Sequence, residues 1–535
     1  MPGDRSVMPP LRLPSEAELA RQALAAPLLA RAVRLARRLG DGAPVGADGQ
    51  PERAGLTRLA GELGLEGDPG GLAATRAAWR LAAGTGLLRI TAEDGTEAGA
   101  APDGSRREGP AGRRAVPGEQ AARVTGGGPR EILELWRGGL ETVLTEAETE
   151  AGTGTGNEAA GEGEGEGEGE GEGEGAGSGA GAAAPDRPSG EAAGTLGRVL
   201  AALYVLTALE GGGPGDPERG FVPLPALAAT VVVPEDMAEP TDAVLEEVSE
   251  EVMRLDRRFR LLEPLGLVEY RPVDETLIEE LDGPGEPADG TGGGTAGDGG
   301  GRAGAGRAAV SGRGDAAARY GMVRLTALGA HGVRARLLDA GITAPLTGDL
   351  AGQGAETLLD TVTGYPEAAA RDEVEEWLDR REPVAAAREL LAAGRGDDPA
   401  APLRRLGCQQ ALALIGREAE PALREVLDDR HLGGLARVWL AEHGATGVPE
   451  PSEEMVFWLT VDTLAAQLGA DGDSAELEEL VLGLVGRHGA FFDTAWRVDH
   501  PATGEVLEAM GRLHPDRAVA KAARQAAYKA RSRGR

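Results

Sequence analysis

The segment AEPALREVLDDRHLGGLARVWLAEHG, residues 419–444, carries apolar residues at the spacing of two short helices. Leu423, Val426 and Leu427 mark the inner face of the first helix, and a tight turn leads to a second helix rich in small residues. Because such a pair cannot bury its apolar faces alone, we expect it to stack against neighbouring pairs. The inner face of the second helix is expected at Leu435, Val438 and Leu440.

The same layout recurs on either side of this segment. Residues 383–416 and 504–530 each combine an apolar helix, a short turn and a second helix, and no convincing strand follows about residue 350. The pattern resembles HEAT-type repeats, whose helix pairs stack into an α-solenoid. We therefore expect a HEAT-like helical-repeat domain over residues 346–535.

A different element order precedes this region. Three helices are expected at 196–211, 222–231 and 242–266, and two strands follow at 267–273 and 322–329. The phrase VRLTALGAHGVRARLLDAG, residues 323–341, resembles the second wing strand and closing helix of winged-helix proteins, where "LT-x-x-G" joins strand to helix. The resemblance implies a winged-helix-like module over residues 194–345.

The first part of the chain shows the same order once more. Helices are expected at 26–40, 56–64 and 72–84, followed by a strand at 87–90. Helix, helix, helix and strand is the order of a winged helix-turn-helix. We therefore expect a first winged-helix-like module over residues 1–150.

Low-complexity stretches separate these parts. The run GEGEGEGEGEGEGEG at 161–175 combines like charges with glycine and cannot offset the entropy of its own ordering, so residues 151–193 are expected to form a disordered linker. Two further stretches, at about 92–128 and 282–315, are expected to be disordered insertions, the second of them at a wing tip. The predicted fold class is mainly α: two winged-helix-like modules with small β wings, joined by Gly/Glu linkers to a HEAT-like α-solenoid.

Composition fits an intracellular protein. The chain has 535 residues, a formal net charge of -33, 85 glycines and a single cysteine, Cys408, so no intramolecular disulfide can form. Neither an export signal nor a long apolar run is evident, and a cytoplasmic location is expected. Only two of 55 basic residues are lysines. This bias and the layout resemble a group of actinobacterial proteins of uncharacterised function, and the resemblance implies an architecture without an activity.

Positive charge is concentrated at the two ends of this acidic chain. Residues 1–90 hold 12 arginines against 9 acidic residues, a balance of +3. If the first module binds duplex DNA, its longest helix would present Thr75, Arg76 and Arg80 to the major groove. The third helix of the second module starts with several glutamates, which disfavours a DNA contact there.

A basic stripe runs along the last helix. Positions 517, 521, 524, 528, 531 and 535 follow steps of four and three, while valine and alanine occupy the opposite side. The favoured interpretation is a solvated outer face of the last repeat. A contact with nucleic acid, or with the chain's own glutamate run, is the alternative. The basic members of the stripe are Arg517, Lys521, Arg524 and Arg531.

Signatures of catalysis are missing from the sequence. Neither lysine follows a glycine, which excludes a Walker A loop, and the six histidines include no HExxH. Cys408 lies among apolar residues of a helix, where a small buried residue is favoured over a nucleophile. We expect no catalytic, cofactor-binding or metal-binding residues, and no small-molecule substrate. The six tryptophans are expected in the core: Trp79, Trp136, Trp377, Trp439, Trp458 and Trp496.

Two classes of function remain. The favoured one is a non-enzymatic protein-interaction or regulatory scaffold, because repeat proteins offer extended surfaces to protein partners and the acidic charge is then no obstacle. The alternative is a transcriptional regulator that binds DNA through the first winged helix. A membrane partner is not expected.

Overall fold

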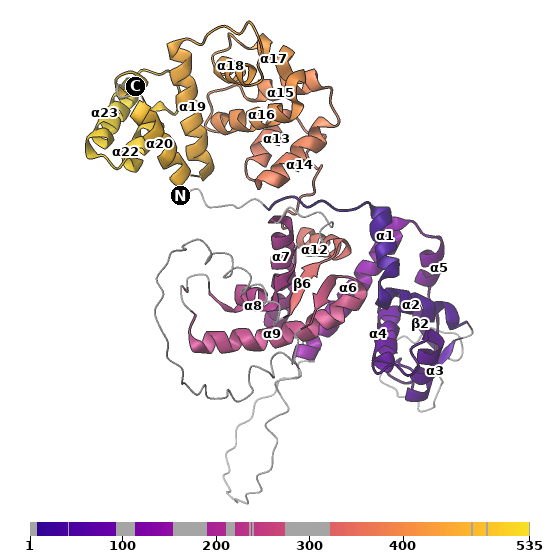
Figure 1. The fold of residues 1–535 in the computed structure, drawn as a ribbon. Coiled ribbons are helices and arrows are strands. Elements are labelled where there is room, and N and C mark those ends of the chain that lie inside the picture. Colours follow the sequence, from indigo (N-terminus) through magenta and orange to yellow (C-terminus); the bar gives the residue numbers. More distant parts are fainter. Residues whose placement is uncertain are drawn as a thin grey trace, which may run out of the picture. The chain divides into compact units, whose positions relative to one another are not determined.

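The computed structural model describes residues 8–40, 42–92, 113–152, 190–209, 220–234, 237, 240–272, 321–471, 474–487 and 491–533. The chain divides into two units, Leu13–Thr343 and Met1–Arg12 with Ala344–Arg535. The fold is mainly α, as expected (Figure 1), and it contains two small three-stranded antiparallel sheets, each with one strand more than a two-stranded wing. None of the helices within the described ranges is both long and apolar enough to cross a membrane.

The first part of the unit 13–343 contains one of the two sheets. Its strand order is β1-β3-β2, so the short first strand pairs with the third. The helices and the strand predicted at 26–40, 56–64, 72–84 and 87–90 are confirmed. The elements are α1 (Glu16–Ala25), α2 (Pro27–Arg38), β1 (Ala43–Val45), α3 (Arg53–Leu63), α4 (Gly71–Gly84), β2 (Leu88–Ala92), β3 (Arg113–Pro117), α5 (Glu119–Gly126) and α6 (Pro129–Gly152).

The disordered insertion predicted at about 92–128 is wrong for its second part. Residues 113–126 form β3 and α5, although they contain few large apolar side chains. Two partners stabilise β3, because β1 and β2 pair with it on either side, and Ala115 at its centre is fully buried. Residues 93–112 lie outside the described part of the chain.

The second part of this unit repeats the order of the first. Its sheet has the order β4-β6-β5, again with the short first strand beside the third. The predicted helices and strands are confirmed, the last strand ending at Leu325. The predicted linker 151–193 and insertion 282–315 fall on residues that are not described, apart from the ends of α6 and α7. The elements are α7 (Gly190–Leu209), β4 (Val222–Pro223), α8 (Leu224–Val232), α9 (Asp242–Leu262), η1 (Glu263–Leu265), β5 (Val268–Arg271), β6 (Met322–Leu325) and α12 (Ala327–Asp339).

The LT-x-x-G phrase has a physical explanation in the junction between β6 and α12. The Thr326 hydroxyl accepts a hydrogen bond from the Gly329 N–H at 2.8 Å and donates one to the Gly266 carbonyl at 2.6 Å. It thereby caps the helix and ties it to the turn before β5. A Cβ atom on Gly329 would lie 1.8 Å from the Leu267 carbonyl oxygen. Only glycine therefore allows this close approach of helix and strand.

Helix α6 joins the two parts of this unit. The indole of Trp136 is fully buried and donates a hydrogen bond to the Leu265 carbonyl at 2.9 Å. A Cβ on Gly332 of α12 would come within 2.8 Å of the same ring. The two predicted modules thus share a packed core, which the sequence pattern does not indicate.

The second unit is helical and includes the start of the chain. Leu11 pairs with Leu346 in an isolated parallel bridge, and Arg12 forms an ion pair with Glu376 at 2.8 Å. The elements are α13 (Ala355–Val362), α14 (Glu367–Leu378), α15 (Pro383–Ala393), α16 (Ala401–Ile415), η2 (Gly416–Ala419), α17 (Glu420–Glu425), α18 (Gly433–Glu442), α19 (Glu453–Asp471), α20 (Ala475–Arg487), α21 (Phe491–Ala495), α22 (Thr503–Leu513) and α23 (Arg517–Arg533).

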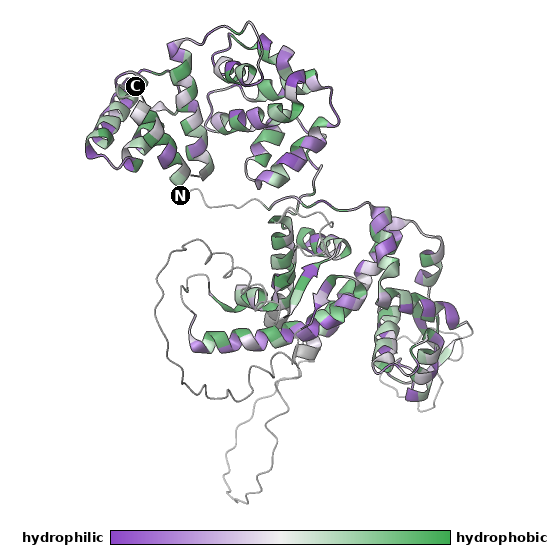
Figure 2. Ribbon diagram, in the orientation of Figure 1, coloured by the Kyte–Doolittle hydropathy of each residue, from purple (hydrophilic) through white to green (hydrophobic). Residues whose placement is uncertain are grey.

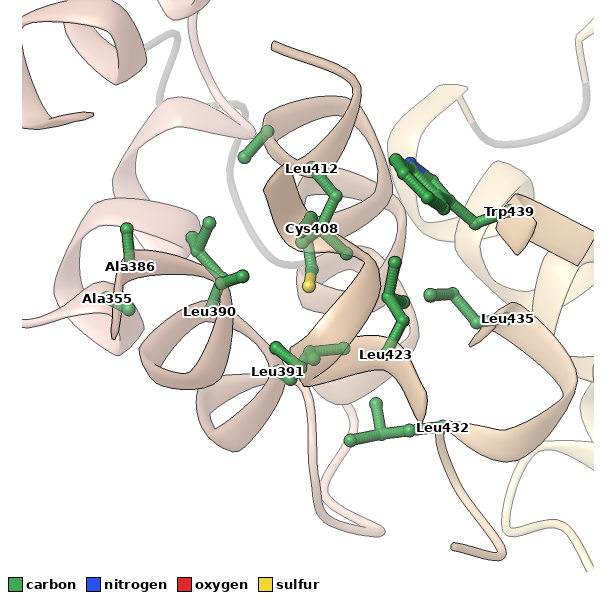
Figure 3. Close-up of a cluster of buried hydrophobic side chains, with 14 of the residues drawn as sticks. Ala355, Ala386, Leu390, Leu391, Cys408, Leu412, Leu423, Leu432, Leu435 and Trp439 are labelled. Carbon is green, nitrogen blue, oxygen red and sulfur yellow. The ribbon is translucent and has the colours of Figure 1, made fainter. Parts of the chain in front are cut away.

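Helices α13 to α18 enclose one apolar cluster, shown in Figure 3. Cys408 lies in its middle among leucines, as predicted for a small buried residue. In the opening segment α17 ends at Glu425, so Val426 is buried in the turn and not in a helix. Val438 is 37% exposed, and its predicted place on the inner face of α18 is wrong. The indole of Trp439 occupies that inner face instead.

Candidate functional site

The residues predicted to meet DNA are not presented together. Thr75 is fully buried, and its hydroxyl donates a hydrogen bond to the Gly71 carbonyl at 2.7 Å, so its predicted exposure is wrong. Arg80 is half-buried against α6, with its Nε 3.4 Å from a carboxylate oxygen of Glu146. Of the three predicted residues, only Arg76 is exposed. Its neighbours on the exposed face are Leu72 and Ala73, which offer no donors or acceptors for base edges.

The predicted basic stripe on α23 is exposed. Arg517, Lys521 and Arg524 make no ion pair within the described residues, whereas Arg531 is paired with Glu508 of α22. Of the small residues predicted on the other side, Ala523 and Ala526 are buried, whereas Val519, Ala522 and Ala530 are only partly buried. The buried face of α23 also includes Ala520 and Ala527.

Small residues allow α22 and α23 to pack closely. A Cβ on Gly511 would lie 2.8 Å from Cγ of Arg524 and 3.2 Å from the Ala520 carbonyl oxygen. A Cβ on Gly504 would lie 3.0 Å from Cγ of Arg531. The stems of these arginines therefore cover the glycines of α22, and their charged ends remain in solvent.

A buried polar cluster joins α16, α19 and the turn between α21 and α22. The carboxylate of Asp462 in α19 accepts two hydrogen bonds from Arg405 of α16, through Nε at 2.9 Å and Nη2 at 2.5 Å. It accepts a third from Nε2 of His500 at 3.0 Å. The exposed fractions of the Arg405, Asp462 and His500 side chains are 2%, 6% and 0%. Arg405 also donates to the Gly394 and Gly396 carbonyls, so its charge is well compensated.

The hydrogen bonds of His500 define its protonation. Its Nδ1 accepts from the Ala502 N–H at 3.1 Å, so the ring proton lies on Nε2, which donates to Asp462. With both nitrogens occupied, His500 is not placed to transfer a proton to a ligand. Its ring also meets Trp458 edge-on, with centroids 4.8 Å apart. The cluster therefore fixes the turn between α21 and α22.

The pKa of Asp462 is lower than that of a free aspartate. Burial acts to raise this pKa, but the hydrogen bonds from His500 and Arg405, together with the charge of Arg405, outweigh burial. The group is therefore held as a carboxylate. Burial alone raises the pKa of the Cys408 thiol to about 12, which makes this sulfur a poor nucleophile at neutral pH.

A groove of about 760 Å³ opens beside the turn that His500 anchors. Trp496 is half-buried on its wall, with the Arg497 guanidinium 4.4 Å and Lys529 Nζ 5.7 Å from the ring centroid. The other five tryptophans are buried, as predicted, whereas Trp496 is only partly buried and packs against the apolar cluster of α19 to α23. The charged residues of the lining are Asp397, Arg430, Asp499, Glu505, Glu508, Arg531 and Arg533.

Sequence reasoning missed the cluster and most of this groove. Arg405, Asp462 and His500 are far apart in the chain, and none belongs to a spacing motif. The one available signal was Asp462 at an otherwise apolar helical position, next to buried Val461. Across the described ranges, no three histidine, cysteine or acidic side chains are placed to hold a metal ion.

Comparison with known proteins gives no relative: the chain matches no family model, no curated protein and no solved structure. The resemblance to actinobacterial winged-helix and HEAT-like proteins remains a prediction.

Proposed function

We propose that the protein is a non-enzymatic protein-interaction scaffold whose groove beside Trp496 binds a peptide segment of a partner. The observation that carries this proposal is the lining of the groove, in which a half-buried tryptophan lies among seven charged side chains of both signs. Tryptophan and arginine are enriched at the energetic centres of protein interfaces.

The lining favours a peptide over a metabolite. Small-molecule pockets are mostly apolar, with few polar groups. Here arginines and carboxylates face the same space, and a peptide backbone with charged side chains can satisfy both. The contacts of Arg430 are long, 3.4 Å to the Asp397 carboxylate and to the Asp499 carbonyl and 3.7 Å to the Asp499 carboxylate, and its side chain is half exposed. It can therefore turn toward a ligand carboxylate at small cost.

The finer architecture is part of the proposal. We assign both sheets with their helices to winged-helix-like modules, because the order helix, short strand, helix, helix and two-stranded wing occurs twice, with equivalent strand orders. We assign residues 346–535 to a HEAT-like helical-repeat domain, supported by the shared core of α13 to α18 and by the close packing of α22 and α23. In such proteins, modules of both kinds serve as docking units, although the fold alone does not fix the function.

DNA binding by the first module is the second candidate. Its support is the positive balance of residues 1–90 and the exposed Arg76. Against it stand the buried Thr75, the pairing of Arg80 with Glu146 and the apolar neighbours of Arg76. A gel shift of the full chain with duplex DNA at low salt tests it. Binding that weakens in Arg76→Ala and falls steeply with salt would favour this candidate.

Selection from a random peptide library against the full chain tests the scaffold proposal. We expect peptides with Kd below about 100 μM, which corresponds to about 5.5 kcal/mol. Trp496→Ala and Arg430→Ala should each weaken binding at least tenfold. Arg388→Ala is the matched control, because Arg388 is equally exposed and pairs with Glu425 outside the groove. The proposal fails if no peptide is selected, or if the selected peptides bind both groove variants unchanged.

A further inference from the structure

Helix α9 buries one face inside its unit and leaves the opposite face exposed to solvent. The buried face holds Leu255, Phe259 and Leu262, which pack inside the unit. On the other face, Leu245 is 50% and Met253 52% exposed, with the exposed Ser249 midway between them. Figure 2 shows hydrophilic and hydrophobic residues alternating along this helix. About half of each of these two apolar side chains is thus in contact with solvent.

Charge along this exposed face changes sign from one end to the other. Positions 242, 246, 249, 253 and 257 follow steps of four and three, so they share one side of the helix. Asp242 and Glu246 lie at its start and make no ion pair within the described residues. Arg257 lies at its end, where its Nε donates a hydrogen bond to the Met253 carbonyl at 3.2 Å, and it makes no ion pair within the described residues. Acidic and basic ends are thus about 22 Å apart, at 1.5 Å per residue.

We infer that α9 pairs antiparallel with α9 of a second copy of this chain. A two-fold axis between positions 249 and 250 places Asp242 opposite Arg257 of the second copy, and the same contact occurs again at the other end. Leu245 and Met253 of both copies then meet around the axis. A two-fold interface uses the same patch on both chains, so a face that is complementary to its own reversal fits this symmetry.

Charge also selects the direction of pairing. A parallel arrangement would place Asp242 beside Asp242 and Arg257 beside Arg257, which repel each other. Glu250 lies near the axis, and its charge is compensated by Arg254 of the same helix, 2.7 Å away, so the two copies of Glu250 do not repel each other strongly. Leu245 and Met253 supply the apolar contact, and the charged ends fix the register.

The association is expected to be weak. Stable dimers typically bury about 800 Å² of surface on each partner, and a single pair of helices of this length buries less. A monomer–dimer equilibrium in the micromolar range or above, weakened by salt, is therefore expected. The inference goes beyond the proposed function, since the groove beside Trp496 is built from other residues and can bind a peptide in either oligomeric state.

Sedimentation of the full chain over a wide concentration range tests the inference. We expect dimers at low salt, and at least tenfold weaker association in Asp242→Arg and in Arg257→Asp. The double variant Asp242→Arg with Arg257→Asp should recover the association, because the two charges are only exchanged. Arg517→Asp, a charge reversal at an exposed arginine of α23, is the control. A monomer at all concentrations, or a double variant as weak as the singles, overturns the inference.

Cysteine crosslinking tests the orientation. Cys408, the only native cysteine, is fully buried, so an introduced cysteine is the only accessible thiol. Ser249→Cys lies at the axis and should form a disulfide-linked dimer on mild oxidation, whereas Asp242→Cys should not. Combining Asp242→Cys with Arg257→Cys should restore crosslinking. Crosslinking of Asp242→Cys alone would contradict the antiparallel arrangement.

Discussion

Replacing Asp462 by asparagine should destabilise the C-terminal unit more than any exposed charge change. The substitution keeps the shape of the side chain and removes its charge. It leaves the guanidinium of Arg405, 2% exposed, without its counter-ion. The amide also turns an N–H₂ group toward Arg405 or His500, which both donate at this point. Breaking a buried pair in this way costs about 3–5 kcal/mol.

Hydrogen exchange at α16 and α19, measured by mass spectrometry on the full chain, is the assay. A loss of 3 kcal/mol or more accelerates exchange about 100-fold in segments that open with the whole unit. The melting temperature of the unit should fall by roughly 10 °C. Glu425→Gln is the matched control, because its partner Arg388 is exposed and the pair lies on the surface.

The destabilisation should also depend on pH. Because the pKa of Asp462 is lower in the folded chain than in the unfolded one, its carboxylate stabilises the fold above about pH 4 and loses this effect as the pH falls through the folded pKa. Wild type and Asp462→Asn should therefore differ most at neutral pH and converge in acid. Equal exchange in both proteins at pH 7 would refute the reasoning.

Two substitutions and one labelling experiment test other parts of the structure. Gly329→Ala should destabilise the unit 13–343 by about 3 kcal/mol in chemical unfolding, because its Cβ would overlap the Leu267 carbonyl. Gly138→Ala is the control: nothing lies within 4 Å of its Cβ, and it should stabilise α6 by about 0.5–1 kcal/mol. Thr326→Val should cost about 1–2 kcal/mol in the same assay, because it removes the cap of α12. Cys408, with a pKa of about 12, should resist iodoacetamide at pH 8 in the native chain and react after unfolding in urea.

Periodicity predicted the helices well because most of them are amphipathic. The LT-x-x-G phrase predicted the junction at Thr326 for a local reason, since the cap and the close approach at Gly329 both need particular residues at fixed spacing. The stretch 113–126 was misassigned because its order comes from pairing with β1 and β2, which lie far away in the chain. A sequence pattern therefore predicts structure that depends on local spacing, and it fails where the structure depends on pairing with distant segments.

The candidate site was missed for a related reason. Thr75 lies one turn before Trp79 on the apolar face of α4, so the spacing itself already indicates its burial. Arg80 looks exposed on a helical wheel of α4 alone, and its contact with Glu146 of α6 partly covers it. Val438 likewise lies at a helical apolar position, yet the neighbouring Trp439 takes the inner face. His500 carried no signal in sequence, because its role arises from Asp462, a residue on another helix.

The cluster and the groove belong to one arrangement. Stability alone does not explain why these buried positions hold Arg405, Asp462 and His500. Well-packed hydrophobic residues of similar size often stabilise a fold as much as a buried ion pair does. A hydrogen bond, unlike apolar packing, also fixes direction. The bond from His500 to Asp462 and the bond from the Ala502 N–H to His500 hold the turn in one orientation. That turn places Val498 and Asp499 on the wall of the groove. The buried charges of Arg405 and Asp462 thus set the geometry of the groove through His500, which itself lines it.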